Sequence, residues 1–460
     1  MLAVFGIIAS LCLLMGLAYR NHSVIVIAPL CALVAVAIDG ELSLTATYTQ
    51  IFMASLGTFI QRYFPLFLLG SIFGKLMEET GSAATIAHRV VGLIGSRHAI
   101  LSLVLTCALL TYGGVSLFVV VFTVFPIAVV LFRQANLPPR LIPAAIALGS
   151  FTFTMSALPG TVQIQNLIPM PFFKTDSYAA PGMGLMAAAI MFSGGIGWLS
   201  FRARQALRNG EGFMNEGESI RISNEIAIAD ASGPPILVAL VPLLCMIVLN
   251  FVLSQYLVPG WKADYLGEKR FGATSLDKVA GTWSTILAMA ASIVCMLGLH
   301  RGRGHTMRES IARGANGSLL PVFNAASEFG YGSTIAALTG FETVKLWMAA
   351  VAPTRPLISE ALSVNVLAGI TGSASGGLSI ALEALGSTFY ERGLAAGISP
   401  EVMHRVASLS CGGLDTLPHN GAVITLLLIC GRTHKESYAD IAVVSLVIPL
   451  IATATVIALA

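Results

Sequence analysis

Charged side chains are scarce in this sequence. Only 11% of its 460 residues are Asp, Glu, Lys or Arg, whereas 56% are hydrophobic and the mean hydropathy is +0.82. A soluble globular domain carries about 25% charged residues. The composition therefore excludes an ordinary soluble protein, and no nucleic-acid partner is expected.

Motifs for nucleotide, metal and disulfide chemistry are also missing. No GxxxxGK[ST] phosphate loop occurs, which argues against an ATP-driven pump. The seven cysteines contain no CxxC pair, so neither a disulfide nor a metal site is implied. We expect no cofactor.

Long apolar runs are what the sequence has instead. Runs of roughly 20 residues are long enough to cross a bilayer. They cover residues 2–18, 24–38, 51–74, 180–201, 236–256, 279–299 and 439–460. The first run lacks the basic start and small-residue cleavage site of a signal peptide, so we expect a retained helix. The sequence predicts a multi-pass protein of the inner (plasma) membrane, in contact with its lipid bilayer.

Breaks in the apolar runs occur twice, 259 positions apart. Residues 112–116 (Tyr-Gly-Gly-Val-Ser) align with 371–375 (Thr-Gly-Ser-Ala-Ser), and residues 158–161 (Leu-Pro-Gly-Thr) align with 417–420 (Leu-Pro-His-Asn). Four of these positions carry the same residue in both copies. Matched Gly or Pro interruptions in two halves of a hydrophobic chain point to the binding site of a secondary transporter.

The placement of Lys and Arg predicts the orientation of the spans. The loops that carry most of the Lys and Arg residues can all lie on one side of the membrane only under one condition. Residues 99–131 and 357–390 must each form a re-entrant hairpin, and the two hairpins must enter from opposite faces. We therefore expect an all-α membrane protein with two inverted repeats, 1–201 and 234–460, joined by a cytoplasmic linker, 202–233. Each repeat would hold about five transmembrane helices plus one hairpin, with broken helices at the midplane. Both termini would lie outside.

The breaks are expected to form the substrate site. Interrupted helices leave amides unpaired and direct helix ends into the gap, which favours an organic anion. The alternative is that small residues only permit close helix packing. The candidate binding residues are Gly113, Gly114, Ser116, Pro159, Gly160, Thr161, Gln163, Asn166, Gly372, Ser373, Ser375, Thr416, His419 and Asn420.

One copy of the repeat carries titratable groups that the other lacks. Asp415 aligns with Ser156, and His419 aligns with Gly160. A carboxyl removed from water is protonated more readily, which suits a proton carrier. The alternatives are a helix N-cap for Asp415 and a packing role for His419. Glu383 and Glu328 are further candidates for coupling to protons.

These segments together resemble the gluconate permease (GntP-type) family of organic-anion/proton symporters, within the wider ion-transporter superfamily. The resemblance rests on residues 112–119, 151–161, 163–166 and 414–422. It implies two inverted repeats, a scaffold that forms a homodimer, and an elevator-type transport domain whose hairpin tips and broken helices bind the substrate. It also implies substrates such as gluconate, related sugar acids or 3-hydroxybutyrate.

Other functions remain as alternatives to proton-coupled uptake of a hydroxy-monocarboxylate. Dicarboxylate relatives in the superfamily use sodium with a Ser-Asn-Thr tip, and neither tip here contains Asn. That difference favours a transporter coupled to protons over a sodium-coupled carboxylate importer. An intramembrane hydrolase using Ser373 or Ser375 would need a GxSG motif, which the second tip lacks, and a channel would need no second ion. We therefore expect a transporter and not an enzyme.

Overall fold

The computed structural model describes residues 2–20, 22–115, 117–213, 233–301, 304–343, 355–418 and 420–460. Within these ranges the chain forms helices and connecting turns, with no β-strand. Ser116 and His419, both named as site candidates, lie outside the described residues, as does most of the segment assigned to the linker.

The first half contains two long helices, a helical hairpin and a broken segment. Its helices are α1 (Leu2–Tyr19), α2 (Val24–Asp39), α3 (Leu44–Ala46), η1 (Thr47–Phe52), α4 (Met53–Glu79), α5 (Ser82–Ile94), η2 (Ser96–His98), α6 (Ala99–Tyr112), α7 (Leu117–Gln134), η3 (Pro139–Leu141), α8 (Ile142–Ser150), α9 (Phe153–Ser156), α10 (Ile164–Leu167), α11 (Met170–Phe173) and α12 (Pro181–Arg208). The hairpin of α6 and α7 is the one predicted from the break at residues 112–116.

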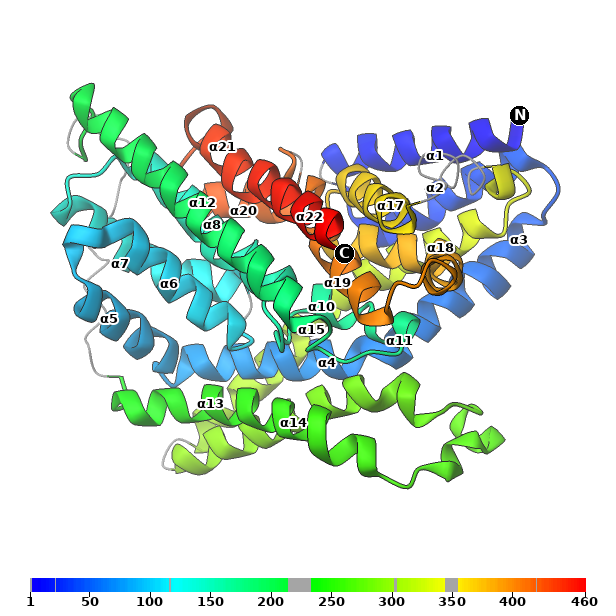
Figure 1. Cartoon of the computed structure of the whole chain (residues 1–460), viewed down its shortest axis with the longest axis horizontal. Coiled ribbons are helices and arrows are strands. Elements are labelled where there is room, and N and C mark those ends of the chain that lie inside the picture. Colours follow the sequence, from blue (N-terminus) through cyan, green and yellow to red (C-terminus); the bar gives the residue numbers. More distant parts are fainter. Residues whose placement is uncertain are drawn as a thin grey trace.

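The second half has a similar order of elements. Its helices are α13 (Ile236–Val252), η4 (Leu253–Leu257), η5 (Val258–Gly260), η6 (Asp264–Gly267), η7 (Lys269–Phe271), α14 (Leu276–Leu299), α15 (Gly304–Ala336), α17 (Pro356–Thr371), α18 (Ala374–Ala395), α19 (Pro400–Cys411), η9 (Leu414–Thr416), α20 (Gly421–Ile429), α21 (His434–Ala442), η10 (Val443–Val447) and α22 (Ile448–Leu459). Helices α17 and α18 form the second hairpin. The two hairpins lie on opposite sides of the molecule (Figure 1).

Helices α4 and α15 pack against each other through the middle of the fold. Small residues bring their backbones close: a Cβ added at Gly314 would lie 2.7 Å from Cα of Ile72. The rings of Phe59 and Phe329 meet at this contact with centroids 5.3 Å apart. Helix α14 packs against α4, and α13 packs against α14, along the lower edge of Figure 1. The first hairpin contacts the pair of α4 and α15 through α7, and the second contacts it through α18.

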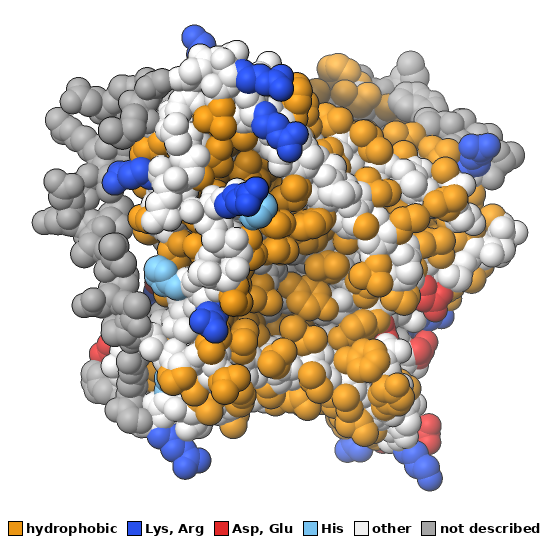
Figure 2. Space-filling model, turned by 60° about the vertical axis from the view of Figure 1, so that its left-hand side comes forward, with side chains coloured by type: hydrophobic (Ala, Val, Ile, Leu, Met, Phe, Trp, Pro, Cys, Tyr) orange, Lys and Arg blue, Asp and Glu red, His pale blue; other side chains and the backbone are white. Residues whose placement is uncertain are grey.

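Five helical segments are long and apolar enough to cross a membrane, counting only the described residues. They are 44–79, 181–208, 236–260, 276–299 and 434–459, and the pair of α5 and α6, bent by 97°, makes a sixth candidate. Figure 2 shows hydrophobic side chains over much of one face, with Lys and Arg mainly at the upper left and along the lower edge. Apolar side chains exposed in this way suit contact with lipid.

Asp440 on α21 joins the two halves at one end of α12. Its carboxylate accepts hydrogen bonds from Arg202 Nε at 2.8 Å, Trp198 Nε1 at 3.0 Å and Arg140 Nη1 at 3.2 Å. Only 1% of the Asp440 side chain is exposed. Because Arg140 lies in η3 and Arg202 lies on α12, this buried cluster attaches α21 to the first half of the chain.

The sequence-based expectations need two corrections. The interruption expected at residues 158–160 is much wider, because the backbone is irregular or only briefly helical from Phe151 to Gln163. The positions of Lys and Arg also predict a basic loop that contains Arg308 and Arg313, followed by a span over residues 318–337, but both arginines lie on α15 instead. A 33-residue helix is about 50 Å long, so α15 extends well beyond the predicted span.

Candidate functional site

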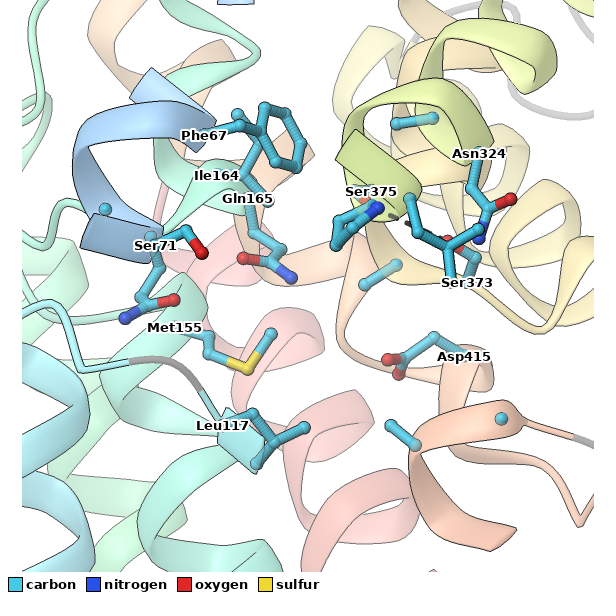
Figure 3. A pocket seen from close by; sticks show the side chains of 18 of the residues that line it. Phe67, Ser71, Leu117, Met155, Ile164, Gln165, Asn324, Ser373, Ser375 and Asp415 are labelled. Atoms are coloured by element: carbon cyan, nitrogen blue, oxygen red, sulfur yellow. Dashed lines mark hydrogen bonds between the residues drawn. The ribbon is translucent and has the colours of Figure 1, made fainter. Parts of the chain in front are cut away.

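A cavity of about 810 Å³ lies where the two hairpin tips and the two broken segments meet (Figure 3). The first hairpin contributes Thr111, Gly114 and Leu117. The broken segment of the first half contributes residues 150–151, Met155 and 162–165. The second half contributes residues 371–375, Asp415 and 420–422. The remaining walls come from α4, α15, residues 22–24 at the start of α2, Leu167 and Met289 on α14. Both predicted tips and the segments around both predicted helix breaks therefore meet at one space, although residues 158–161 themselves do not line it.

The first hairpin tip is attached to the break of its own half. Gly114 has φ +81, a left-handed conformation that glycine adopts without strain. Gln163 Nε2 donates to the carbonyl of Thr111 at 2.7 Å. Tyr112 Oη donates to the carbonyl of Pro159 at 2.8 Å. These bonds hold the tip and the broken segment in one arrangement at the cavity wall.

The second tip is attached to its own break in a similar way. Gly372 has φ +63 and ends α17. Asn420 Nδ2 donates to the carbonyl of Gly372 at 2.7 Å, and Asn420 Oδ1 accepts from the amide of Val423 at 2.9 Å. Asn420 is therefore both the N-cap of α20 and the link to the tip. The N-cap alternative considered for Asp415 is wrong, because Asp415 lies in η9, before this cap.

Among the helices that begin at the cavity are the three that follow the two tips and the second break, with 18, 22 and 9 residues. Leu117 starts α7, Ala374 starts α18 and Gly421 starts α20, and all three residues line the cavity. A helix N-terminus carries a partial positive charge and amides without intrahelical partners. No Lys or Arg lines the wall in the part of the chain that the structure describes. The helix starts therefore make the cavity receptive to an anion.

Two buried carboxyl groups lie on the cavity wall. Asp415 is 6% exposed and Glu328, on α15, is 3% exposed. Figure 3 shows the Asp415 carboxylate pointing into the cavity, toward the side of Met155. The Glu328 carboxylate lies against Gly376 in the first turn of α18, where a Cβ would overlap it. One acid thus belongs to a break, and the other connects α15 to the second hairpin.

Several polar atoms at the cavity wall have no hydrogen-bond partner within the described protein. They are Thr111 Oγ1, Ser150 Oγ, Gln165 Oε1, Asn324 Oδ1 and Asp415 Oδ1. Leaving such a group buried and unpaired costs about 1–3 kcal/mol. Since three of the five are carbonyl or carboxylate oxygens, the wall offers acceptors for hydroxyl groups of a bound molecule.

The residues named from sequence divide into three groups by position. Those that line the cavity are Gly114, Gln163, Gly372, Ser373, Ser375, Asn420, Asp415 and Glu328. Those that lie off its wall are Gly113, Pro159, Gly160, Thr161, Asn166, Thr416 and Glu383. Ser116 and His419 are not described.

The residues off the wall have structural partners. A Cβ at Gly113 would overlap Leu243 on α13, and one at Gly160 would meet the ring of Tyr178. Thr161 Oγ1 donates to the carbonyl of Thr154 at 2.7 Å. In this arrangement these residues shape the broken segment behind the wall and do not face the cavity.

The remaining residues off the wall also have partners. Asn166 Nδ2 donates to the carbonyls of Thr161 and Ser177 at 3.0 and 2.8 Å. Thr416 Oγ1 donates to the carbonyl of Ser445 at 3.3 Å. Glu383 accepts from Ser333 Oγ at 3.3 Å, at the contact of α18 with α15.

Sequence reasoning missed some residues of the wall. Asn324 precedes Glu328 by four residues on α15, so helical periodicity puts both on one face. Ser150 ends α8 just before the broken segment. Arg405 was also missed, although an arginine inside an apolar segment is a signal for function. It lies on α19, behind the wall.

Comparison with known proteins identifies the family. Residues 1–309 match the model of the GntP family permease. The chain is 46% identical to the uncharacterized transporter YxjC of Bacillus subtilis (strain 168), over 96% of this chain and 95% of that protein.

Two solved transporters share the fold at low sequence identity. The YdaH transporter of Alcanivorax borkumensis matches with TM-score 0.53 and 18% identity, over 89% of this chain and 87% of that one. Neisseria gonorrhoeae MtrF, described with a class of antimetabolite efflux pumps, matches with TM-score 0.51 and 14% identity, over 90% and 83%. The protein is thus a multi-pass membrane transporter and not an enzyme, and it belongs to the GntP family of permeases.

Proposed function

We propose that the protein is a secondary active transporter that carries a hydroxy-monocarboxylate into the cell together with protons. Gluconate, a related sugar acid or an acid such as 3-hydroxybutyrate fits this description. The observation that carries the proposal is the cavity itself, where three helix starts lie on the same wall as unpartnered oxygen acceptors.

The two features of the wall suit the two ends of such a substrate. The amides at the starts of α7, α18 and α20 favour a carboxylate. Gln165, Asn324 and Ser150 offer acceptors to hydroxyl groups. A volume of about 810 Å³ is ample for a six-carbon acid.

The proton would be carried by carboxyl groups at the same cavity. Asp415 has an oxygen without a partner, and Glu328 is buried against the second tip. A carboxyl in such surroundings neutralises its charge by binding a proton. Protonation of Asp415 would also remove a negative charge from beside the substrate anion, which links proton binding to substrate binding.

Inverted repeats with an elevator motion are part of the same proposal. The helices α4, α6, α7 and α8 are followed, about 259 positions later, by α15, α17, α18 and α19 in the same order. Opposite-facing hairpins that close one site from two sides suit alternating access. We further propose a homodimer in the inner (plasma) membrane, with both termini outside and residues 202–233 in the cytoplasm.

Sodium coupling is the second candidate. Oxygen atoms are the ligands that hard cations prefer, and the unpartnered oxygens of Thr111, Ser150 and Asp415 lie on the same wall. The argument against sodium coupling is that neither hairpin tip contains the Asn found in the tip of the sodium-coupled relatives.

Uptake by proteoliposomes tests the proposal and separates the two ions. With labelled D-gluconate and 3-hydroxybutyrate as probes, we expect accumulation to follow an inward proton gradient and to ignore an inward sodium gradient. Accumulation that needs sodium and ignores pH would refute proton coupling. A panel of competing acids that leaves uptake unchanged would refute the proposed substrate class.

A further inference from the structure

Arg405 on α19 is fully buried and forms all its described hydrogen bonds with the first half of the chain. Its relative exposure is 0%. Nε and Nη2 donate to the carbonyl of Ala179 at 3.1 and 2.8 Å. Nη1 donates to the carbonyl of Ser156 and to Asn166 Oδ1, both at 3.0 Å. The guanidinium is therefore well supplied with acceptors.

These acceptors are neutral, so none of them offsets the positive charge of Arg405. The described residues place no carboxylate in an ion pair with it. Asp176, in the loop before α12, is close enough to interact with Arg405 electrostatically. Its hydrogen bonds, however, come from the amide of Tyr178 and from Gln255 Nε2, each at 2.7 Å. A buried charge that lacks a directly bonded counter-charge is costly, and such groups inside membrane proteins commonly have a functional reason.

The charge lies directly behind the wall of the substrate cavity. Its acceptors Ser156 and Asn166 are the chain neighbours of Met155 and Gln165, which line the cavity. Ser408, one turn further along α19, donates to the carbonyl of Gln165 at 2.7 Å. Neighbouring Cα atoms are about 3.8 Å apart, so the guanidinium lies on the order of 8 Å from the cavity.

We propose that Arg405 selects substrates by charge, acting across the wall on the carboxylate without touching it. This inference rests on the proposed function. A cation on the order of 8 Å from an anion, at an effective dielectric constant of about 20, changes affinity roughly thirtyfold. The helix starts add partial charges, but no other full positive charge from Lys or Arg lines the described wall. Arg405 is therefore a positioning residue whose full positive charge adds to the partial charges of the helix starts.

The alternative is that Arg405 only holds the broken segment in place. The two roles differ in what they predict for a neutral substrate analogue. Loss of the charge weakens binding of the acid and leaves an uncharged analogue unaffected, whereas a displaced wall weakens binding of both.

The test compares D-gluconate with its neutral amide in equilibrium binding to the purified protein in nanodiscs. For Arg405→Gln we expect gluconate to bind about 10- to 30-fold more weakly, with little change for the amide. Arg405→Lys keeps the charge and should keep most of the preference for the acid. Ser408→Ala is the matched control: it removes an uncharged hydrogen bond from α19 to the same wall and should weaken both ligands equally.

A second variant tests the idea if Arg405→Gln does not fold. Asn166→Asp puts a carboxylate 3.0 Å from Nη1 and so offsets the charge in place. It also removes the two hydrogen bonds that Asn166 Nδ2 donates to the carbonyls of Thr161 and Ser177, which should weaken both ligands alike. We expect the preference for gluconate over the amide to fall as in Arg405→Gln. An unchanged preference in either folded variant would overturn the inference. Wild-type protein that binds no acid at all would instead refute the proposed function.

Discussion

The link between Asn420 and the second hairpin tip gives the most direct test of how the site is held. The Asn420 side chain makes two bonds, to the amide of Val423 at 2.9 Å and to the carbonyl of Gly372 at 2.7 Å. Loss of an N-cap costs about 1 kcal/mol, and loss of one hydrogen bond costs a similar amount, about 1 kcal/mol. Asn420→Ala should therefore lose about 2 kcal/mol in total.

A serine at the same position separates the two bonds. Asn420→Ser keeps the cap, because serine is a good N-cap residue, and loses the donor that reaches Gly372. If the tip must be held in place for binding, both variants should bind the acid about fivefold more weakly, since 1.4 kcal/mol corresponds to tenfold in affinity. Only Asn420→Ala should also show the extra loss of stability.

Binding of labelled D-gluconate in nanodiscs and thermal unfolding in detergent measure the two effects. Thr433→Ala is a suitable control, because it removes the capping box of α21, whose residues do not line the cavity. It should lower the unfolding temperature without changing affinity. Wild-type affinity in Asn420→Ser would refute the reasoning, since the bond to Gly372 would then have no part in binding.

Three further predictions concern the acids, the acceptors and the tip. Asp415→Asn should still bind the acid but lose accumulation driven by a proton gradient in proteoliposomes; normal accumulation would remove Asp415 from coupling. Gln165→Leu or Asn324→Leu should weaken 3-hydroxybutyrate roughly three- to tenfold through the lost hydrogen bond and leave butyrate unchanged in a competition assay, whereas equal losses would argue against hydroxyl recognition. Gly376→Ala should cost about 1–3 kcal/mol in thermal unfolding, because the new methyl group overlaps the Glu328 carboxylate. Gly317→Ala meets only Ser71 Oγ at 3.3 Å and should cost much less.

The hairpins could be predicted because their signals are local. Tyr112-Gly113-Gly114 and Thr371-Gly372 interrupt apolar runs, and glycine is the residue that ends a helix in a left-handed conformation. The helices on both sides begin and end close to the expected residues. Convergence of the breaks followed from their matched positions in the two halves.

The direction of side chains within a break could not be predicted. A helix or strand has a period that assigns each residue to a face, and an irregular segment has none. Thr161 and Gln163 are two residues apart, yet only Gln163 lines the cavity. Asn420 was named for the substrate, while its observed bonds are to the chain itself.

Contacts between the two halves of the chain could not be predicted from the sequence either. Arg405 is separated from its acceptors by more than 200 residues, and nothing in its local sequence names Ser156 or Ala179. The same holds for Asp440 and its two arginines. Such partners are determined by the packing of the whole chain. The repeat does not predict them either, because Arg405 and Asp440 each occur in one copy of the repeat only.

The Arg405 hydrogen bonds also bear on biogenesis. The carbonyls of Ala179 and Ser156 receive their donor from a residue made 226 and 249 positions later. At about 5–20 residues per second of synthesis, the delay is roughly 10 to 50 seconds. During that time the first half is in the membrane with its broken segment incomplete. The first half therefore cannot reach its final form alone, and its maturation ends only when α19 has been inserted.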